Sequence, residues 1–491
     1  MLSPQATFDE LPNTCNPMSY AQPDRLATLA TLFGMSPPAL STCRVLELGC
    51  CDASNIISTA YSLPEATITG IDASEEKIKA GQEAISALKL TNITLQHTDI
   101  LDINLESGQF DYIIAHGIFS WVSPQVQDKI FSICEHNLAP NGVAYIGFNT
   151  KPGWNVNNTI RDMMSYISVT VDDPAVKINQ RKAVLKFLLD ATKETNTPYE
   201  KLVGEAVNDL VKLPEKFVCT ELVEEANEPL YFNEFMQRAK SNNLIYLGDA
   251  FLHTMLPESF PEPQQQALQM FNGDLIVQEQ MMDILSNRSF RHTLLCHKDV
   301  ELNRSLSPAK LAGLHIASSM QPSNDSYEKF ENNRGNLTTT KLIVQSALRY
   351  LAKEWPRAVL FDELLEQARQ DAKSNSTTDT ETITNALLMG YSKSMIELYS
   401  QPTKLVNTVS EYPQASPIAS WQAKQTPKIT NLRSEWSIIE NAVCIHLLPY
   451  LDGRHSHADL LNLLENWIKD GKLSLNITNQ KTGEALTLTD T

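Results

Sequence analysis

Strand-like and helix-like segments alternate between Cys43 and about residue 150, and this alternation limits the possible folds more than any other feature. Val-, Ile- and Leu-rich runs predict strands at residues 44–49, 66–72, 92–99, 110–118 and 142–149, with helical patterns between them, for example at 54–62. A turn is expected at Gly142, before the fifth strand. Such alternation predicts a parallel, doubly wound α/β sheet.

Three notable residues lie at the carboxyl ends of the first three expected strands. Gly49 opens a loop of small residues, Asp72 ends the second strand and Asp99 ends the third. Doubly wound sheets bind their ligands at this edge. An aspartate after a strand is also common in turns, so one alone decides little. Three such features at consecutive strand ends predict a ligand site.

The loop sequence VLELGCCDASN (residues 45–55) indicates which ligand to expect. Dinucleotide sites have Gly-x-Gly-x-x-Gly, whereas Gly49 is the only glycine here, and Glu47 lies two residues before it. The loop resembles the S-adenosylmethionine loop of class I methyltransferases, in which the later glycines correspond to Cys51 and Ala53. Side chains at these positions narrow the approach to a ligand, so we expect weakened rather than abolished binding.

This resemblance implies where S-adenosylmethionine binds. The loop backbone meets the methionine part, Asp72 holds the ribose, and Asp99 with Ile100 frames the adenine. The complete set of candidate cofactor-binding residues is Glu47, Gly49, Cys50, Cys51, Asn55, Asp72, Ala73, Asp99, Ile100 and His116.

Longer segments extend the resemblance over most of the chain. They are HGIFSWVSPQV (116–126), NLAPNGVAYIGFNTKPGWN (137–155) and residues 22–38, 224–250 and 290–304. Together they resemble a bacterial family in which a methyltransferase carries a methyltransferase regulatory domain. This family includes rickettsial protein lysine methyltransferases that modify outer-membrane proteins. The chain departs from the family at Gln22, where histidine is usual, and at Phe148, where tyrosine is usual.

The resemblance predicts a Rossmann-like class I methyltransferase sheet, a helical insertion and a mainly helical, winged-helix-like C-terminal module. The expected segments are an N-terminal arm or cap (1–42), an S-adenosylmethionine-binding core (43–150), the helical insertion (151–214), the completion of the core with the regulatory region (215–304) and the C-terminal module (305–491). The sixth and seventh strands are expected at 244–250 and 289–297, and a β-wing around 401–408. The insertion is either a lid over the site or an added packing layer.

Methyl transfer to lysine requires a neutral amine, although the usual pKa of lysine is ~10.4. A desolvating aromatic channel lowers that pKa. Phe119, Trp121, Phe148 and Trp154 follow the fourth and fifth strands, where such a channel is expected. His116 is a candidate base, and Asn149 a candidate holder of the substrate amine. The candidate catalytic residues are His116, Trp121, Asn149 and Trp154. No set of metal ligands is expected.

Charge and composition limit the partners. The net charge is −18, which argues against a nucleic-acid binder and suits a basic substrate. No long apolar run or secretory pattern is visible, so we expect a cytoplasmic protein without membrane insertion. The eight cysteines show no zinc spacing and no Cys-x-x-Cys, so we expect reduced, mostly buried thiols.

The function expected from these features is S-adenosylmethionine-dependent N-methylation of lysine side chains in a protein substrate, with lysine-rich proteins among the candidates. Two alternatives remain open. One is a methyltransferase that acts on a small molecule. The other is a non-enzymatic, cofactor-binding interaction protein, because the loop has lost two glycines.

Overall fold

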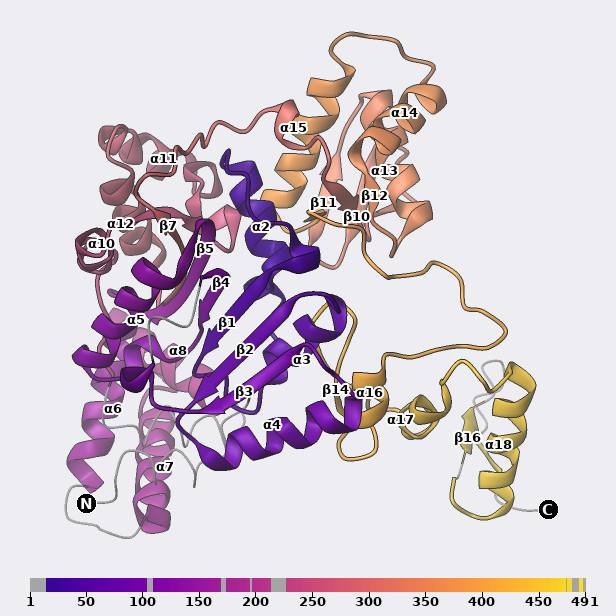
Figure 1. Ribbon diagram of the computed structural model, residues 1–491, viewed down its shortest axis with the longest axis horizontal. Helices are drawn as coiled ribbons and strands as arrows, with labels where there is room; N and C mark the ends of the chain where they lie inside the picture. Colours follow the sequence, from indigo (N-terminus) through magenta and orange to yellow (C-terminus); the bar gives the residue numbers. More distant parts are fainter. Residues whose placement is uncertain are drawn as a thin grey trace.

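A seven-stranded sheet forms the centre of the protein in a computed structural model that describes residues 15–103, 109–168, 174–194, 197–212, 227–473, 475–478 and 485–488 (Figure 1). Its strands are β1 (Arg44–Leu48), β2 (Thr67–Asp72), β3 (Ile93–His97), β4 (Phe110–Ala115), β5 (Leu138–Asn149), β6 (Leu244–Asp249) and β7 (Phe290–His297). Their spatial order is β3-β2-β1-β4-β5-β7-β6. The strands β1 to β5 pair in parallel, and β7 runs antiparallel to both of its neighbours, β5 and β6. The α/β fold class and the expected sixth and seventh strands are confirmed.

Helices accompany the strands of this sheet, and local sequence signals mark where some of them begin and end. They are α2 (Pro23–Leu32), α3 (Ser54–Ser62), α4 (Glu75–Leu88), α5 (Pro124–Asn137), α10 (Phe232–Ser241), α11 (Glu262–Leu268) and α12 (Leu275–Ser286). The Ser74 hydroxyl accepts a hydrogen bond from the Lys77 backbone N–H at 3.3 Å, so Ser74 caps α4. Lys89, in the left-handed conformation, ends the same helix.

The turn expected at Gly142 is wrong. The fifth strand begins at Leu138 and runs through Gly142 to Asn149, with a register irregularity opposite residues 110–112 of β4. A Cβ atom at Gly142 would lie 2.9 Å from the Asp111 carbonyl oxygen. The glycine therefore serves the close approach of two strands rather than a turn.

The insertion is helical, as expected. It contains α6 (Trp154–Ser168), α7 (Pro174–Ala191) and α8 (Pro198–Lys212), which lie below α5 in Figure 1. These helices share a hydrophobic cluster separate from the main core, formed by Ile160, Met164, Leu185, Leu188, Val203 and Val207. Residues 169–173, 195–196 and 213–214 of the expected insertion lie outside the described part of the chain.

The C-terminal region begins with a mixed unit whose core is continuous with that of the sheet. Its helices are α13 (Leu342–Glu354), α14 (Phe361–Ala372) and α15 (Asp379–Ser392). Its strands are β8 (His315–Ala317), β9 (Gln321–Pro322), β10 (Lys329–Asn332), β11 (Gly335–Thr338), β12 (Val359–Leu360) and β13 (Glu397–Tyr399). They form two small sheets, β12-β8-β13 and β11-β10-β9.

The last part of the chain is a second small unit, drawn in yellow and orange at the lower right of Figure 1. It contains α16 (Pro417–Gln422), β14 (Lys428–Thr430), β15 (Trp436–Ile438), α17 (Ala442–Leu447), α18 (His457–Lys469), β16 (Leu475–Thr478) and β17 (Ala485–Leu488). The β-wing expected around 401–408 is wrong, because these residues form no strand. The hairpins of this region lie later in the chain, at β14–β15 and β16–β17. Among the described residues, no helix combines the length and apolarity needed to cross a membrane.

Candidate active site

The loop of residues 49–55, here called the glycine loop, keeps a left-handed path even where its residues are not glycine. Gly49 has φ 68°, Cys51 φ 53° and Ala53 φ 62°. A Cβ atom on Gly49 would lie 2.4 Å from Cγ2 of Ile118, which follows β4, so glycine is required there. The left-handed conformation costs a non-glycine residue about 1–2 kcal/mol. The fold thus maintains this turn at Cys51 and Ala53 against local strain, which is typical of functional loops.

Glu47 lies under the glycine loop and is buried. Its Oε1 accepts a hydrogen bond from the Asn55 amide at 2.8 Å. Its Oε2 is buried without a hydrogen-bond partner among the described residues. Burial raises the pKa of this carboxyl to about 8; the hydrogen bond from Asn55 opposes this shift, and the charges of Asp72 and Asp52 add to it. A buried carboxylate oxygen in this state suits a cationic ligand, and S-adenosylmethionine carries an ammonium and a sulfonium.

The N-terminal segment is bound to the same place through Asn55. The Asn55 side-chain oxygen accepts hydrogen bonds from the Met18 backbone N–H and from the Gln22 side chain, both at 2.9 Å. The Thr59 hydroxyl donates to the other end of the Gln22 amide at 2.6 Å. Gln22, which the sequence marked only as a departure from the family, therefore connects this segment to α3.

The second and third strand ends adjoin the glycine loop. The Asp72 carboxylate accepts hydrogen bonds from the backbone N–H groups of Cys51 at 2.8 Å and Ser74 at 2.9 Å. His97, at the end of β3, has its Nε2 3.0 Å from the Ala73 carbonyl oxygen. Asp99 and Ile100 follow β3, and the Asp99 carboxylate accepts from the Leu101 N–H at 2.8 Å. The structure therefore brings these candidate ligand-binding residues to one edge of the sheet.

The two other candidates in the loop, Cys50 and Cys51, differ in their surroundings. The Cys50 backbone N–H donates to the Ile71 carbonyl at 3.0 Å, and the Cys50 thiol is buried. Cys51 forms a disulfide with Cys15, and their Cα atoms are 6.2 Å apart. The expectation of reduced thiols is wrong for this pair, because the N-terminal segment folds back over the loop. Cys43, Cys50, Cys134 and Cys296 are buried free thiols, Cys444 is an exposed one, and Cys219 lies outside the described residues.

His116, at the end of β4, is surrounded by rings that sequence reasoning missed. The ring cluster consists of Tyr20, His116, Phe251, Phe290 and His292, all partly exposed. The His292 ring centroid lies 4.7 Å from that of Tyr20 and 4.9 Å from those of Phe251 and Phe290. The His116 centroid is 5.6 Å from Tyr20 and 5.7 Å from Phe290. The only sequence signal for this cluster was the imidazole of His292 within an expected strand.

The register of β5 and β7 explains this arrangement. Gly147 pairs with His292 and Asn149 with Phe290, so these four positions lie on one face of the sheet. A Cβ atom on Gly147 would meet the Phe290 ring at 3.0 Å and Nδ1 of His116 at 3.1 Å. Glycine at this position therefore leaves room for both rings.

The four predicted aromatic residues separate into two pairs. Phe119 and Phe148 are fully buried and pack on Phe235, which places them in the core and makes their channel role wrong. Phe148 points away from the ring cluster because strand side chains alternate between faces. Trp121 and Trp154 instead contact each other edge to face, with ring centroids 6.1 Å apart.

Asn149 is buried at the end of β5. Its side-chain amide donates to the Asn227 side-chain oxygen at 3.0 Å, and its backbone N–H donates to the Ser120 hydroxyl at 2.9 Å. Buried Trp154 Nε1 has no hydrogen-bond partner among the described residues. The roles of Trp121, Asn149 and Trp154 in catalysis stay predictions.

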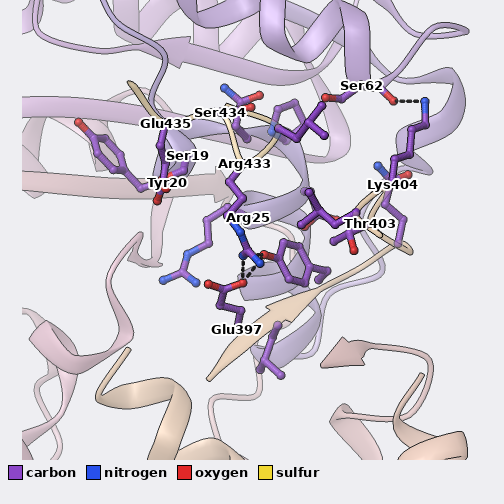
Figure 2. Close-up of a pocket in the computed structure, with 18 of the residues that line it drawn as sticks. Ser19, Tyr20, Arg25, Ser62, Glu397, Thr403, Lys404, Arg433, Ser434 and Glu435 are labelled. Atoms are coloured by element: carbon purple, nitrogen blue, oxygen red, sulfur yellow. Dashed lines mark hydrogen bonds and ion pairs between the residues drawn. The ribbon is translucent and has the colours of Figure 1, made fainter. Parts of the chain in front are cut away.

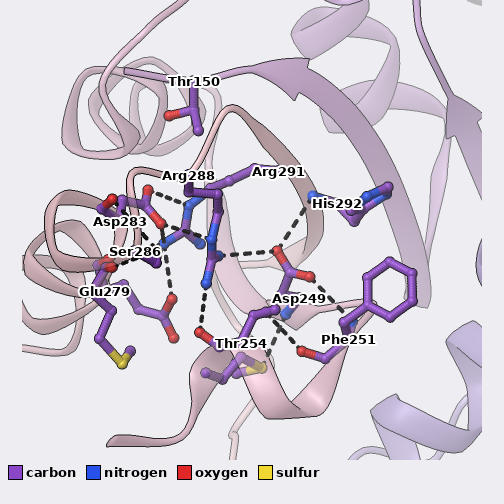
Figure 3. Close-up of polar contacts among 12 residues, drawn as sticks. Thr150, Asp249, Phe251, Thr254, Glu279, Asp283, Ser286, Arg288, Arg291 and His292 are labelled. Atoms are coloured by element: carbon purple, nitrogen blue, oxygen red, sulfur yellow. Dashed lines mark hydrogen bonds and ion pairs between the residues drawn. The ribbon is translucent and has the colours of Figure 1, made fainter. Parts of the chain in front are cut away.

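A buried ion network supports the ring cluster from the other face of β7 (Figure 3). Arg291 forms ion pairs with Glu279 at 2.9 Å and with Asp283 at 2.7 Å, and all three side chains are inaccessible to solvent. Arg288 pairs with Asp283 at 3.1 Å and lies 3.7 Å from Asp249.

Asp249 connects this network to the rings. Its carboxylate accepts hydrogen bonds from the backbone N–H groups of Phe251 at 3.1 Å and His292 at 3.3 Å. In Figure 3, Asp249 lies between Arg288 and the two rings of Phe251 and His292. The network therefore positions two members of the ring cluster.

A cleft of about 280 Å³ opens beside the cluster, between α2, the end of α3 and the segment around β13 (Figure 2). Tyr20 and Phe251 line its wall, as do Arg25 and Lys404. Arg433 forms an ion pair with Glu397 inside it. The ring cluster thus borders a space that the core shares with the C-terminal region.

Known proteins are similar to this chain in both sequence and structure. Three family models match the chain: a methyltransferase domain over residues 45–142, a predicted methyltransferase regulatory domain over 214–297 and a PKMT C-terminal winged helix domain over 411–490. PKMT2 from Rickettsia typhi, solved in complex with AdoHcy, superimposes with a TM-score of 0.85 and 30% identity, over 96% of this chain and 94% of that one. The Rickettsia prowazekii (strain Madrid E) protein RP789 is 34% identical over 96% of this chain and 88% of its own length.

This chain belongs to the PKMT family of methyltransferases. It is an S-adenosylmethionine-dependent methyltransferase. In this methyltransferase the glycine loop, Asp72 and His116 lie in the matched methyltransferase domain, whereas Phe251, Phe290 and His292 lie in the matched regulatory domain. The ring cluster is therefore assembled across both domains. The winged helix match begins at residue 411, after the segment where the wing was expected.

Proposed function

We propose that this methyltransferase transfers the methyl group of S-adenosylmethionine to lysine ε-amines of a protein substrate. The observation that carries the proposal is the cluster of partly exposed rings around His116, next to the glycine loop. Aromatic rings exclude water from a bound amine, which lowers the pKa of the amine toward the neutral, nucleophilic form. Their faces also attract the cationic sulfonium of the cofactor. Similarity over nearly the whole length of PKMT2 from Rickettsia typhi supports the same activity.

In this proposal each group of site residues has a separate role. Glu47 faces the cationic methionine part of the cofactor, Asp72 holds the ribose, and Asp99 with Ile100 frames the adenine. S-adenosylmethionine supplies the electrophilic methyl group. The ring cluster receives the amine and aligns it for an in-line displacement, because alignment supplies much of the acceleration in such reactions. Trp121, Trp154 and Asn149 contact the substrate chain near the amine.

Transfer of labelled methyl groups tests the proposal. The full-length protein is incubated with S-adenosylmethionine labelled in the methyl group and with poly-L-lysine, with poly-L-arginine as the matched control. We expect label in poly-L-lysine alone and methyl-lysine after hydrolysis. Unfolded outer-membrane proteins and their Lys→Arg versions then define the natural substrate class. Cofactor binding without label in any lysine-containing protein would contradict the proposal.

The protonation of Glu47 gives a further prediction. With a folded pKa of about 8, Glu47 holds a proton at pH 7, whereas a bound cation favours its ionised form. Binding of S-adenosylmethionine should therefore release up to about one proton near pH 7. Calorimetry in two buffers of different ionisation enthalpy measures that proton.

Glu47→Gln is the matched control, because the amide keeps the shape of the side chain without the titration. We expect it to abolish proton release. The raised pKa of Glu47 also predicts how the stability of the unliganded protein changes with pH. Glu47 stays protonated in the fold up to a pH of about 8 but ionises near 4.5 when unfolded, so its contribution to stability falls as pH rises through this window. Equal proton release by wild type and Glu47→Gln would remove Glu47 from the cation site.

A further inference from the structure

His116, Tyr145 and His292 form a hydrogen-bonded chain beneath the ring cluster. The Tyr145 hydroxyl lies 2.8 Å from Nδ1 of His116 and 2.7 Å from Nδ1 of His292. Tyr145 is fully buried in β5, whereas both histidines are partly exposed. A phenol has one proton, so it donates to one imidazole and accepts from the other. In the neutral chain, therefore, only one of the two Nδ1 atoms carries a proton at a time.

Both ends of this chain are available for proton exchange. Among the residues that the structure describes, neither His116 Nε2 nor His292 Nε2 hydrogen-bonds to another protein group. The His116 end adjoins the glycine loop, because Ile118 packs against Gly49. The His292 end lies among Tyr20 and Phe251, which line the cleft.

Burial keeps the chain neutral near pH 7. Burial, and to a smaller extent the nearby His292, lowers the pKa of His116 to about 3. Burial likewise lowers the pKa of His292 to about 4, with Asp249 opposing and Arg288 adding to the shift. Burial raises the pKa of Tyr145, as do Tyr20, Asp249 and Glu47. An imidazole with so low a pKa cannot store a proton at pH 7, but it can pass one on.

We propose that His116, Tyr145 and His292 relay the proton that the substrate lysine must lose before methyl transfer, an inference that rests on the proposed function. The ammonium gives a proton to His116 Nε2, and the Nδ1 proton of His116 moves to the Tyr145 oxygen. The phenol proton moves to His292 Nδ1, and His292 Nε2 releases its proton to water. The amine keeps the freed electron pair and bonds the methyl carbon as the carbon–sulfur bond breaks. Reorientation of the partly exposed imidazoles resets the chain.

The pH dependence of turnover distinguishes a relay from a structural role. Tyr145→Phe and His292→Gln break the chain, and His297→Gln is the control on the same strand. With poly-L-lysine at pH 7 we expect the first two variants to lose about 100-fold in kcat. The KM for S-adenosylmethionine should stay within about twofold of wild type. The loss should shrink as pH approaches the amine pKa of ~10.4, where the substrate loses its proton unaided.

A purely structural role predicts the same loss at every pH, and that result would overturn the proposal. Nitrogen-15 NMR of the histidine-labelled protein gives a readout that needs no methyl acceptor. We expect neutral His116 and His292 at pH 7, and a changed tautomer at His116 in Tyr145→Phe, because His116 carries its proton on Nδ1 only while it donates to the Tyr145 oxygen. Charged imidazoles at pH 7, or a His116 tautomer unchanged by Tyr145→Phe, would also overturn the relay. Failure of wild type to methylate poly-L-lysine, with these NMR signatures present, would instead count against the proposed function.

Discussion

The glycine loop and the β6–α12–β7 region hold the two sides of the site in different ways. The loop is a short, continuous segment that keeps left-handed turns at Cys51 and Ala53, and its Cys51 N–H donates a hydrogen bond to Asp72. The other region uses a buried ion network to position Phe251 and His292. The ligand side of the site, formed by the glycine loop, thus depends on backbone shape. The opposite side, formed by the rings that receive the amine in the proposed function, depends on buried ion pairs. The two sides should fail differently when mutated.

The largest effect is expected in the ion network. Arg291→Ala removes the ion-pair partner of buried Glu279 and one of the two partners of buried Asp283, which should cost about 3–5 kcal/mol of unfolding free energy. The matched control is Arg357→Ala, which removes partly exposed ion pairs with Glu354 and Glu363 and should cost about 1 kcal/mol or less. Denaturant unfolding measures both. Similar losses in the two variants would show that burial of the network does not govern its contribution.

Reduction of the Cys15–Cys51 disulfide should have the next largest effect. The bond joins residues 36 positions apart, and a cross-link of this span stabilises by about 2–4 kcal/mol. A reductant should lower the unfolding midpoint of wild type but not of Cys15→Ser, with Cys444→Ser as a control that responds like wild type. Whether the bond is closed in the cell depends on the redox potential of its compartment. A midpoint insensitive to reductant would contradict this prediction.

The Asp72 carboxylate should matter for affinity more than for stability. Asp72→Ala removes the proposed ribose contact and a hydrogen-bond acceptor for Cys51. Hydrogen bonds to a charged group contribute about 1.5–3 kcal/mol, which corresponds to about 10–100-fold weaker binding of S-adenosylmethionine. Asp102→Ala, at an exposed position beyond β3, is the control. Calorimetric titration decides, and unchanged affinity in Asp72→Ala would exclude the ribose assignment.

The smallest effect is expected at Ala53. Ala53→Gly relieves left-handed strain but adds freedom to the unfolded chain and removes a buried methyl group, so the net change in stability should stay below about 1 kcal/mol. Gly49→Ala at the other end of the loop should be clearly destabilising, because its new Cβ would collide with Ile118. Equal unfolding midpoints for these two variants would show that the loop adapts more readily than its geometry indicates.

Much of the ligand side could be predicted from sequence because its signals are local. The strand pattern, the Ser74 cap and the polar residues at the ends of β1 to β3 are each visible within a few residues, and the structure brings them to one edge. Phe119 and Phe148 show the limit of this reasoning. Phe119 follows the expected fourth strand and Phe148 lies near the end of the fifth, but the strand alternation and the packing of α10 place both in the core.

The sequence by itself determined the order of strands and helices and the position of the glycine loop, because side-chain periodicity and loop chemistry act over neighbouring residues. Tertiary structure alone decided the rest. Tyr145 and His292 are 147 residues apart, yet they hydrogen-bond because β5 and β7 are adjacent in the sheet. Cys15 meets Cys51 because the N-terminal segment folds back over the loop. Such contacts depend on which distant segments pack together to bury apolar surface, and no local pattern encodes that choice.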